Sequence, residues 1–310
     1  MLSLGRVALD GTKVRANASR RKAMSYARMS EKQRILAAEV SALLAEAEQI
    51  DHDEDAEFGR DNKGYGLPAE LARRESRLAK ITQAKAALEA QAQERAAEAG
   101  ARAVPKPAAQ RNFTDPESRI MKTADGSFHQ CFNAQAVVDE DHQVIVATDL
   151  NNCAADSATL VPMTEQISGN TGREPKQLLA DAGYCCQANL EAAAAITTQT
   201  GTQFLIATGR LECDELVQAA PTGRIPKHFT PKQRMARKLR TKAGQGAYAR
   251  RKAIVEPVFG QIHTLQGKYV LLRGLDNARQ EWNLLATCHN LRKLHGHLGV
   301  AGLGRLQLAI

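Results

Sequence analysis

The 310-residue sequence is poor in aromatic side chains, in paired cysteines and in long apolar runs. Aromatic residues make up 4% of the chain and alanine supplies much of its apolar content, which favours long surface helices over a β-rich shell. The six cysteines form no C-x-x-C pair, so we expect neither a zinc site nor a disulfide framework. No run of about 18 apolar residues occurs and no apolar signal core follows Met1, so we expect a soluble cytoplasmic protein without a membrane partner.

Acidic residues are missing from the segment 216–255, although the whole chain contains 34 of them. Because eleven cations fall in this basic segment, contact with phosphate groups explains the bias better than a solvated surface does. The formal net charge of +8 also favours an anionic partner. The cations are Arg224, Lys227, Lys232, Arg234, Arg237, Lys238, Arg240, Lys242, Arg250, Arg251 and Lys252.

One carboxylate, Glu256, follows the basic segment directly. Three cations precede it at 250–252, and the nearest acidic residues are Glu215 and Asp276. A polyanion is bound by Lys and Arg, whereas a divalent cation is bound by carboxylates. The pattern therefore suits a site that holds both at once.

The order of expected elements predicts a mixed sheet flanked by helices. A strand at 4–10 leads into an Asp10-Gly11 turn and a second extended piece. Apolar residues at helical spacing then predict a helix from Ser30 and another at 68–99, joined by a polar turn with an acidic cluster at 51–57. After these come strands at 133–138, 143–150, 177–181 and 203–207, and helices at 156–167 with Asp156 or Ser157 as cap, at 189–196, around Glu256 and at 281–295.

Three acids stand out by context. Asp10 and Asp181 each follow an apolar strand, and Glu256 lies on or beside a later helix. If the two strands are neighbours, these acids could share divalent cations, as phosphodiester chemistry with two metal ions about 3.5 to 4 Å apart requires. Taken alone, each acid also fits a turn, a cap or a surface position, and a chain with 34 acids contains many such triples.

Several sequence blocks, in this order, resemble those of the DDE transposases of bacterial insertion sequences, in the IS1182-like branch of the IS4 group. The blocks are Leu9-Asp10-Gly11-Thr12-Lys13-Val14, Asp115-Pro116-Glu117-Ser118-Arg119-Ile120-Met121-Lys122, Asn133-Ala134-Gln135-Ala136-Val137-Val138-Asp139, Ala180-Asp181-Ala182-Gly183-Tyr184, Glu256-Pro257-Val258-Phe259-Gly260-Gln261-Ile262 and His289-Asn290-Leu291-Arg292-Lys293-Leu294. The resemblance extends from Asp10 to Leu294.

The resemblance implies an RNase H-like fold that is interrupted by a helical hairpin after the first strand. It implies that Asp10, Asp181 and Glu256 are both the catalytic residues and the ligands of Mg²⁺ or Mn²⁺, with two ions. Tyr248 and Arg251 would belong to the signature around the glutamate and contact the transposon end. The family often has Lys where this chain has His263, so a phosphate contact there would be weaker or pH-dependent.

The expected division is 1–29 for the first strands of the RNase H-like core, 30–104 for the hairpin insert, 105–270 for the rest of the core and 271–310 for a closing helical segment. The family also carries a DNA-binding region before the first aspartate, and here Met1 lies nine residues upstream of Asp10, which suggests a truncated copy.

The expected activity is hydrolysis of the phosphodiester at the element's ends and transfer of the 3′-hydroxyl into target DNA. A homodimer in the DNA complex and no small-molecule cofactor are expected, with the protein at the nucleoid when bound. Two alternatives stay open, an inactive DNA-binding remnant and an RNase H-like nuclease without strand transfer. The candidate DNA-binding residues are Tyr248, Arg250, Arg251, Lys252, Lys232, Arg234, Arg237, Lys238, Arg240 and His263.

Overall fold

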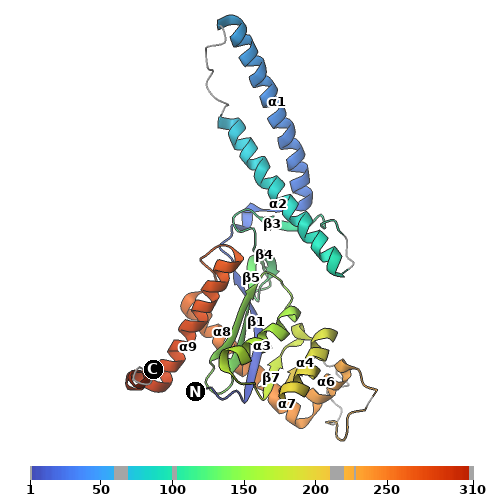
Figure 1. Ribbon diagram of the computed structural model, residues 1–310, viewed down its shortest axis with the longest axis vertical. Coiled ribbons are helices and arrows are strands. Elements are labelled where there is room, and N and C mark those ends of the chain that lie inside the picture. Colours follow the sequence, from blue (N-terminus) through green and yellow to red (C-terminus); the bar gives the residue numbers. More distant parts are fainter. Residues whose placement is uncertain (1, 59–68, 100–102, 210–219, 227, 307–310) are drawn as a thin grey trace. The chain divides into compact units, whose positions relative to one another are not determined.

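The computed structural model describes residues 2–58, 69–99, 103–209, 220–226 and 228–306. Two compact units are present (Figure 1), one of Met1–Asn17 with Met121–Ile310 and the other of Ala18–Ile120. The glycine-rich part of the predicted turn at 59–66, and residues 216–219 and 227 of the basic segment, lie outside the described residues. Within the described residues, no helix combines the length and apolar character that crossing a membrane requires.

The larger unit is built on a six-stranded mixed sheet in the order β4-β5-β1-β7-β8, with β6 also paired to β5. Strand β1 runs antiparallel to β5 and parallel to β7, and β7 is parallel to β8. This mixed sheet with helices confirms the predicted α/β class and is consistent with an RNase H-like domain. The strands are β1 (Arg6–Arg15), β4 (Arg119–Lys122), β5 (Phe128–Asp139), β6 (Ile145–Asn151), β7 (Gln177–Ala180) and β8 (Gln203–Ile206).

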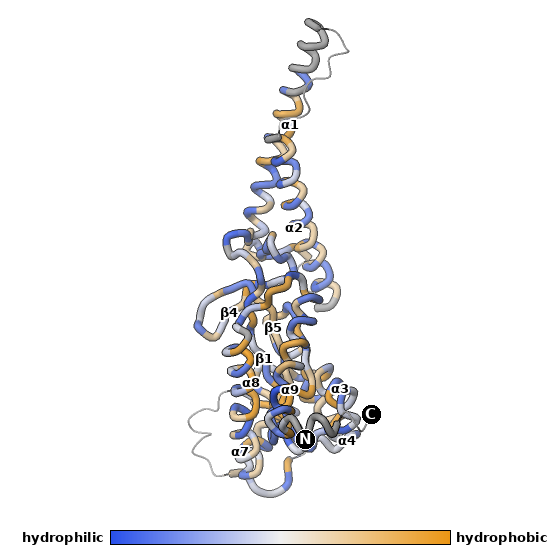
Figure 2. The backbone as a smooth tube through the Cα atoms, turned by 90° about the vertical axis from the view of Figure 1, so that its left-hand side faces the viewer, coloured by the Kyte–Doolittle hydropathy of each residue, from blue (hydrophilic) through white to orange (hydrophobic). Residues whose placement is uncertain are grey.

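Helices cover the sheet, which explains why β5 is buried almost throughout instead of alternating. Val7 and Leu9 of β1 point into a core that they share with α3 (Leu160–Thr171) and α4 (Gln187–Thr200). Helix α8 (Arg251–Gln266) packs against β1 and β5, and α9 (Leu275–Leu306) packs against β6 and α8. Figure 2 shows the apolar stretches along β5, α8 and α9.

The predicted turn at Asp10-Gly11 is wrong. Strand β1 continues through both residues, and Gly11 pairs with Gln135 of β5. The glycine is explained by close packing, because a Cβ at position 11 would lie 2.9 Å from Asp156 Oδ1 and 3.1 Å from Asn133 Oδ1. Asp10 therefore lies inside strand β1, and the residues before and after it are also paired with β5.

The smaller unit contains two long helices, α1 (Tyr26–Phe58) and α2 (Ala69–Ala99), with the short strands β2 (Ala23–Ser25) and β3 (Gln110–Asn112) paired beside them. Met29 and Leu36 of α1 pack with Ile81, Ala84 and Leu88 of α2. The predicted turn over the acidic cluster is wrong, because the helix continues to Phe58.

Helix α8 passes through Pro257 without ending, so Glu256 lies inside a helix and not at its start. Proline cannot donate to the carbonyl four residues earlier. That carbonyl, Ala253 O, instead accepts a hydrogen bond from Gln143 Nε2 at 3.2 Å. Trp282 of α9 is fully buried beside this helix, where its Nε1 donates to Gln135 O, as expected of a core tryptophan.

Candidate functional site

Asp10 and Asp181 come directly after the last residue pair that joins the parallel strands β1 and β7, although β1 itself continues to Arg15 beside β5. Leu9 of β1 pairs with Ala180, the final residue of β7. Because Leu9 and Ala180 are paired, the residues that follow them, Asp10 and Asp181, are neighbours. Burial raises the pKa of the Asp10 carboxyl, and the negative charge of Asp181 raises it further. The structure thus brings these two predicted residues together.

Arg251, the first residue of α8, holds the Asp10 carboxylate. Its Nη1 lies 2.6 Å from Asp10 Oδ2, and only 10% and 18% of the two side chains are exposed. Burial alone would lower the pKa of Arg251, but the Asp10 carboxylate raises it above its ordinary value. Arg251 Nε is buried and has no hydrogen-bond partner among the described residues. The Tyr248 ring centre lies 6.0 Å from the guanidinium carbon.

Asp181 begins a tight turn, η3 (Ala182–Tyr184), and its Oδ1 accepts from Gly183 N at 2.8 Å. Tyr184 at the end of this turn is fully buried, and its hydroxyl donates to Gln135 Oε1. Burial raises the pKa of Tyr184, and the charges of Asp156, Asp10 and Asp181 add to the rise. The phenol is therefore a neutral donor, and three aspartates lie near enough to influence it.

Glu256 is exposed on α8, five residues after Arg251. Since a helix turns about 100° per residue, this separation places the two side chains on different faces. Within the part of the chain that the structure describes, no three His, Cys, Asp or Glu side chains lie close enough together to hold a metal ion. The structure therefore does not join Glu256 to Asp10 and Asp181 in one group.

Asp156 is a residue of this region that the sequence pattern did not single out for chemistry. It precedes η2 (Ser157–Thr159), but its side chain makes no cap hydrogen bond. Its Oδ1 instead accepts from Asn133 Nδ2 at 2.7 Å and from Gln135 Nε2 at 2.8 Å, both on β5. The sequence signal for such a partner was the presence of two amide side chains, Asn133 and Gln135, on a buried strand, because buried polar groups need hydrogen-bond partners.

The candidate DNA-binding residues lie on three consecutive helices. Helix α6 (Pro231–Arg240) begins with a capping box between Thr230 and Gln233, and α7 (Lys242–Ala249) leads from it toward α8. Exposed members include Lys232, Arg250 and Lys252. Helix α6 carries Lys232, Arg234, Arg237, Lys238 and Arg240, α7 carries Tyr248, Arg250 joins α7 to α8, and α8 carries Arg251, Lys252 and His263.

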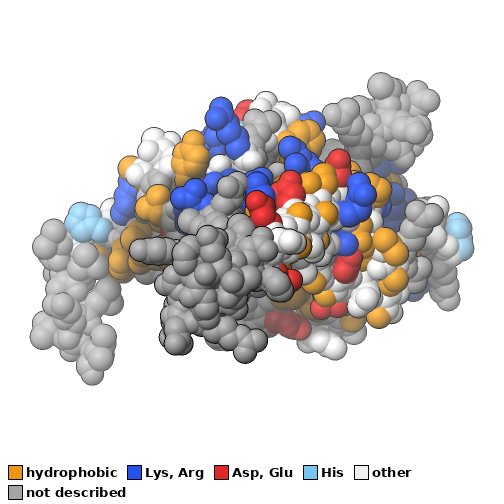
Figure 3. Space-filling view, turned by 90° about the horizontal axis from the view of Figure 1, so that it is seen from above, with side chains coloured by type: hydrophobic (Ala, Val, Ile, Leu, Met, Phe, Trp, Pro, Cys, Tyr) orange, Lys and Arg blue, Asp and Glu red, His pale blue; other side chains and the backbone are white. Residues whose placement is uncertain are grey.

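Some of these cations already have protein partners. Arg250 Nε contacts Glu140 Oε1 at 2.8 Å, although 59% of the arginine side chain remains exposed. Arg237 Nη2 donates to the carbonyls of Thr222 and Gly223. Figure 3, which views the molecule from above, shows a different face, on which Lys and Arg side chains lie among Asp and Glu side chains.

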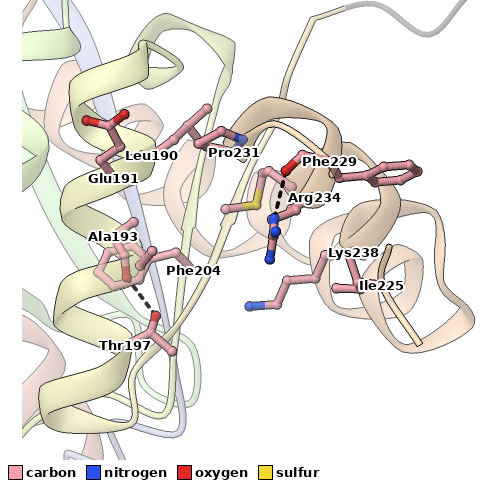
Figure 4. A pocket seen from close by; sticks show the side chains of 12 residues that line it. Leu190, Glu191, Ala193, Thr197, Phe204, Ile225, Phe229, Pro231, Arg234 and Lys238 are labelled. Atoms are coloured by element: carbon pink, nitrogen blue, oxygen red, sulfur yellow. Dashed lines mark hydrogen bonds between the residues drawn. The ribbon is translucent and has the colours of Figure 1, made fainter. Parts of the chain in front are cut away.

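A pocket of about 570 Å³ lies between α4, β8 and α6 (Figure 4). Its apolar wall includes Leu190, Phe204 and Phe229. Two candidate cations also line it: Arg234 Nε donates to Phe229 O at 2.8 Å, and Lys238 Nζ donates to Gln203 Oε1 at 2.7 Å. These two side chains are therefore partly engaged within the protein.

His263 is half-buried on α8, with its ring stacked on Phe259 at 6.5 Å between centroids. Burial lowers the pKa of His263, and Lys268 lowers it further. The imidazole is therefore neutral at pH 7, and any phosphate contact at this position would not be that of a cation.

The chain was compared with known proteins and protein families. No curated protein matches its sequence. Residues 102–291 match the family model of the transposase DDE domain, a range that includes Asp181, Glu256 and the basic segment and begins after Asp10. Because this match covers more than half of the chain, the protein belongs to the family defined by the transposase DDE domain.

Proposed function

We propose that this chain is the catalytic part of an insertion-sequence transposase of the IS1182-like branch of the IS4 group. It hydrolyses the phosphodiester at the element's ends and joins the freed 3′-hydroxyl to target DNA. The observation that carries the proposal is the pairing of Leu9 with Ala180, which sets Asp10 beside Asp181 where the pairing of β1 with β7 ends. Two neighbouring carboxylates in a positively charged chain of the transposase DDE domain family suit phosphodiester chemistry.

In this proposal, the helical hairpin of α1 and α2 interrupts an RNase H-like core. The core comprises 1–29 and 105–270, the insert comprises 30–104, and 271–310 closes the fold. The long helices α1 and α2 lie between β1 and β5 in sequence and share their own small apolar core, which supports an inserted unit.

The residues at the sheet edge fit a divalent cation. Asp10 and Asp181 supply hard oxygen ligands, and Asp10 already holds a positive group, the Arg251 guanidinium, at 2.6 Å. Mg²⁺ is commonly bound through one or two carboxylates together with substrate phosphates. Bound Mg²⁺ or Mn²⁺, as one ion or two, supplies an activated water or 3′-hydroxyl and stabilises the leaving oxygen.

The chain's own residues bind and orient the DNA. Arg251 carries a buried Nε without a described partner, so a phosphate can satisfy it and draw the guanidinium away from Asp10. Lys232 and Lys252 are exposed and suit contacts with the backbone, and the other candidate cations of α6 and Arg250 extend this set. Glu256 is exposed on α8, on a different face from Arg251, so its joining the two aspartates requires a movement of α8 as well as of its side chain.

Tyr248 lies beside Arg251 and would contact the transposon end with it. His263 would act as a neutral hydrogen-bonding group, since its pKa is lowered by burial. We further propose that the complex with DNA contains two copies of the chain, without a small-molecule cofactor.

The test uses labelled duplexes from both flanks of the coding sequence, incubated with the protein and Mn²⁺ or Mg²⁺. The expected result is a metal-dependent nick near an inverted repeat, followed by strand-transfer products on a target plasmid. Nicking without transfer would support the nuclease alternative. Absence of nicking on either flank in both metals would contradict the proposal.

Two observations favour the alternative of an inactive DNA-binding protein. The Asp10 carboxylate is already in an ion pair with Arg251. Among the described residues, no three side chains of metal-binding type form a group. That alternative predicts salt-sensitive binding to the same duplexes with no cleavage in either metal.

A further inference from the structure

A polar cluster around Asp156 lies beside the point where the pairing of β1 with β7 ends. Its Oδ1 accepts three hydrogen bonds, from Asn133 Nδ2 at 2.7 Å, from Gln135 Nε2 at 2.8 Å and from Lys13 Nζ at 3.2 Å. The donors belong to β5 and β1, the two strands with the longest pairing in the sheet. One carboxylate oxygen therefore links both strands to the loop that precedes α3.

Asp156 also lies against the backbone beside each of the two aspartates. A Cβ on Gly11, the residue after Asp10, would lie 2.9 Å from Asp156 Oδ1. A Cβ on Gly183, whose N–H holds Asp181 Oδ1, would lie 3.1 Å from Asp156 Oδ2. The same carboxylate thus packs on the segment that carries Asp10 and on the turn that carries Asp181.

The main chain that carries Asp156 is itself fixed. Thr159 donates to Asp156 O from both its N–H, at 3.1 Å, and its Oγ1, at 2.8 Å. Asn189 of α4 holds the next carbonyl, Ser157 O, at 2.7 Å. A side chain anchored in this way can resist movement of the two segments that it contacts.

The hydrogen bonds that Asp156 Oδ1 already accepts favour bracing over ligation by that oxygen. Oδ1 already accepts from three donors, one of them an ammonium, so it has little capacity left for a cation. The side chain is 23% exposed, which is more than that of Asp10 at 18%, so burial alone does not account for the number of its hydrogen bonds.

We propose that Asp156 is a positioning residue for the pair Asp10 and Asp181. It holds Gly11 of β1 and Gly183 of η3 at one separation, and so keeps the two aspartates at the spacing that a shared cation needs. This inference rests on the proposed function, because it assigns Asp156 a part in that same site.

The test compares Mn²⁺ affinity, by titration calorimetry, in the wild-type chain and in Asp156→Asn, which places an amide where Oδ1 and Oδ2 now lie. The expected result is Mn²⁺ binding weakened by about 10-fold to 100-fold, with DNA affinity unchanged. High Mn²⁺ should restore cleavage by this variant, whereas Asp10→Asn should stay inactive at any Mn²⁺ concentration. Lys13→Gln replaces the charged ammonium donor by a shorter, neutral amide and should shift Mn²⁺ affinity in the same direction by less.

The matched control is Asp139→Asn. Asp139 is a fully buried aspartate at the opposite end of the β1 and β5 pairing, where it accepts from Leu4 N at 2.9 Å. The Asp139→Asn substitution should lower the melting temperature of the protein and leave its Mn²⁺ affinity unchanged.

Two outcomes would overturn the inference alone while the wild-type chain binds Mn²⁺ and cleaves. One is wild-type Mn²⁺ affinity in both Asp156→Asn and Lys13→Gln. The other is loss of cleavage by Asp156→Asn that high Mn²⁺ does not restore, which would make Asp156 a ligand. A wild-type chain that neither binds Mn²⁺ nor cleaves would overturn the proposed function, and this inference with it.

Discussion

The part of the sheet where the pairing of β1 with β7 ends and the first turns of α8 present their carboxylates in different ways. Asp10 and Asp181 are placed by hydrogen-bonded register, since Leu9 pairs with Ala180. Glu256 is placed only by its position on a helix, and its side chain is exposed. Strand pairing fixes neighbours to a single residue, whereas a long side chain on a helix keeps several rotamers. In the proposed site, the strand-borne pair is therefore preformed, and the helix-borne acid would have to move to join it.

The most severe way to break the preformed pair is to remove one of its charges. Asp10→Asn or Asp181→Asn should reduce metal-dependent DNA cleavage by at least about 10³-fold, because several kcal/mol of charge stabilisation is lost. DNA affinity should remain within about twofold, since neither residue supplies a cation. Asp276→Asn, an exposed aspartate on α9, is the control and should cleave normally. Cleavage at the wild-type rate in either site variant would reject the pair.

Stability separates the two regions without any DNA. Asp10→Ala leaves the Arg251 guanidinium, which is 10% exposed, without its carboxylate, so unfolding free energy should fall by roughly 2 to 4 kcal/mol. Glu256→Ala removes an exposed side chain and should cost less than about 0.5 kcal/mol. Urea denaturation followed by circular dichroism measures both. Equal losses would mean that the two acids are held alike.

Arg251 connects the two regions, because it lies on α8 and contacts Asp10 of β1. If its guanidinium competes with a cation for Asp10, Arg251→Gln should tighten Mn²⁺ binding by the DNA-free protein about tenfold, within the range of ordinary coupling energies. The same variant should bind DNA more weakly, because a phosphate contact is lost. Titration calorimetry measures the Mn²⁺ affinity. Weaker Mn²⁺ binding would show that Arg251 supports the site and does not occupy it.

The basic helix α6 should affect affinity and not chemistry. Neutralising Lys232, Arg237 and Arg240 to Gln should flatten the slope of log affinity against log salt by about 2.7, at about 0.9 for each of three phosphate contacts. Arg292→Gln, at an exposed position on α9, serves as the single-charge control. Fluorescence anisotropy over a salt series measures both slopes, and an unchanged slope in the triple variant would remove α6 from the DNA-binding surface.

Much of the fold could be predicted from local pattern, because apolar strands and helical spacing survive in the sequence. The strand before Asp181 and the helix after Asp156 lie where the pattern predicts them. The Asp10-Gly11 turn failed because the glycine serves close packing against Gln135 and Asp156, which sequence spacing does not reveal. The prediction of a turn over the acidic cluster was wrong because acidic residues are compatible with a helix.

The site was predictable in part. The strand before Asp181 could be recognised, but Asp10 lies inside β1 and not after a strand as predicted. Which strands are neighbours is a property of the whole sheet, as the pairing of β1 with β7 shows. Asp156 was predicted only as a cap, because its partners Asn133 and Gln135 lie more than twenty residues away in sequence. The Arg251 ion pair spans 241 positions and leaves no local signal.

The most direct test is the anomalous difference map of a crystal of the chain with DNA and Mn²⁺. The account predicts a manganese peak shared by the Asp10 and Asp181 carboxylates, with Glu256 turned toward it and Arg251 on a phosphate. Manganese bound elsewhere, with Arg251 still on Asp10 in the DNA complex, would contradict it.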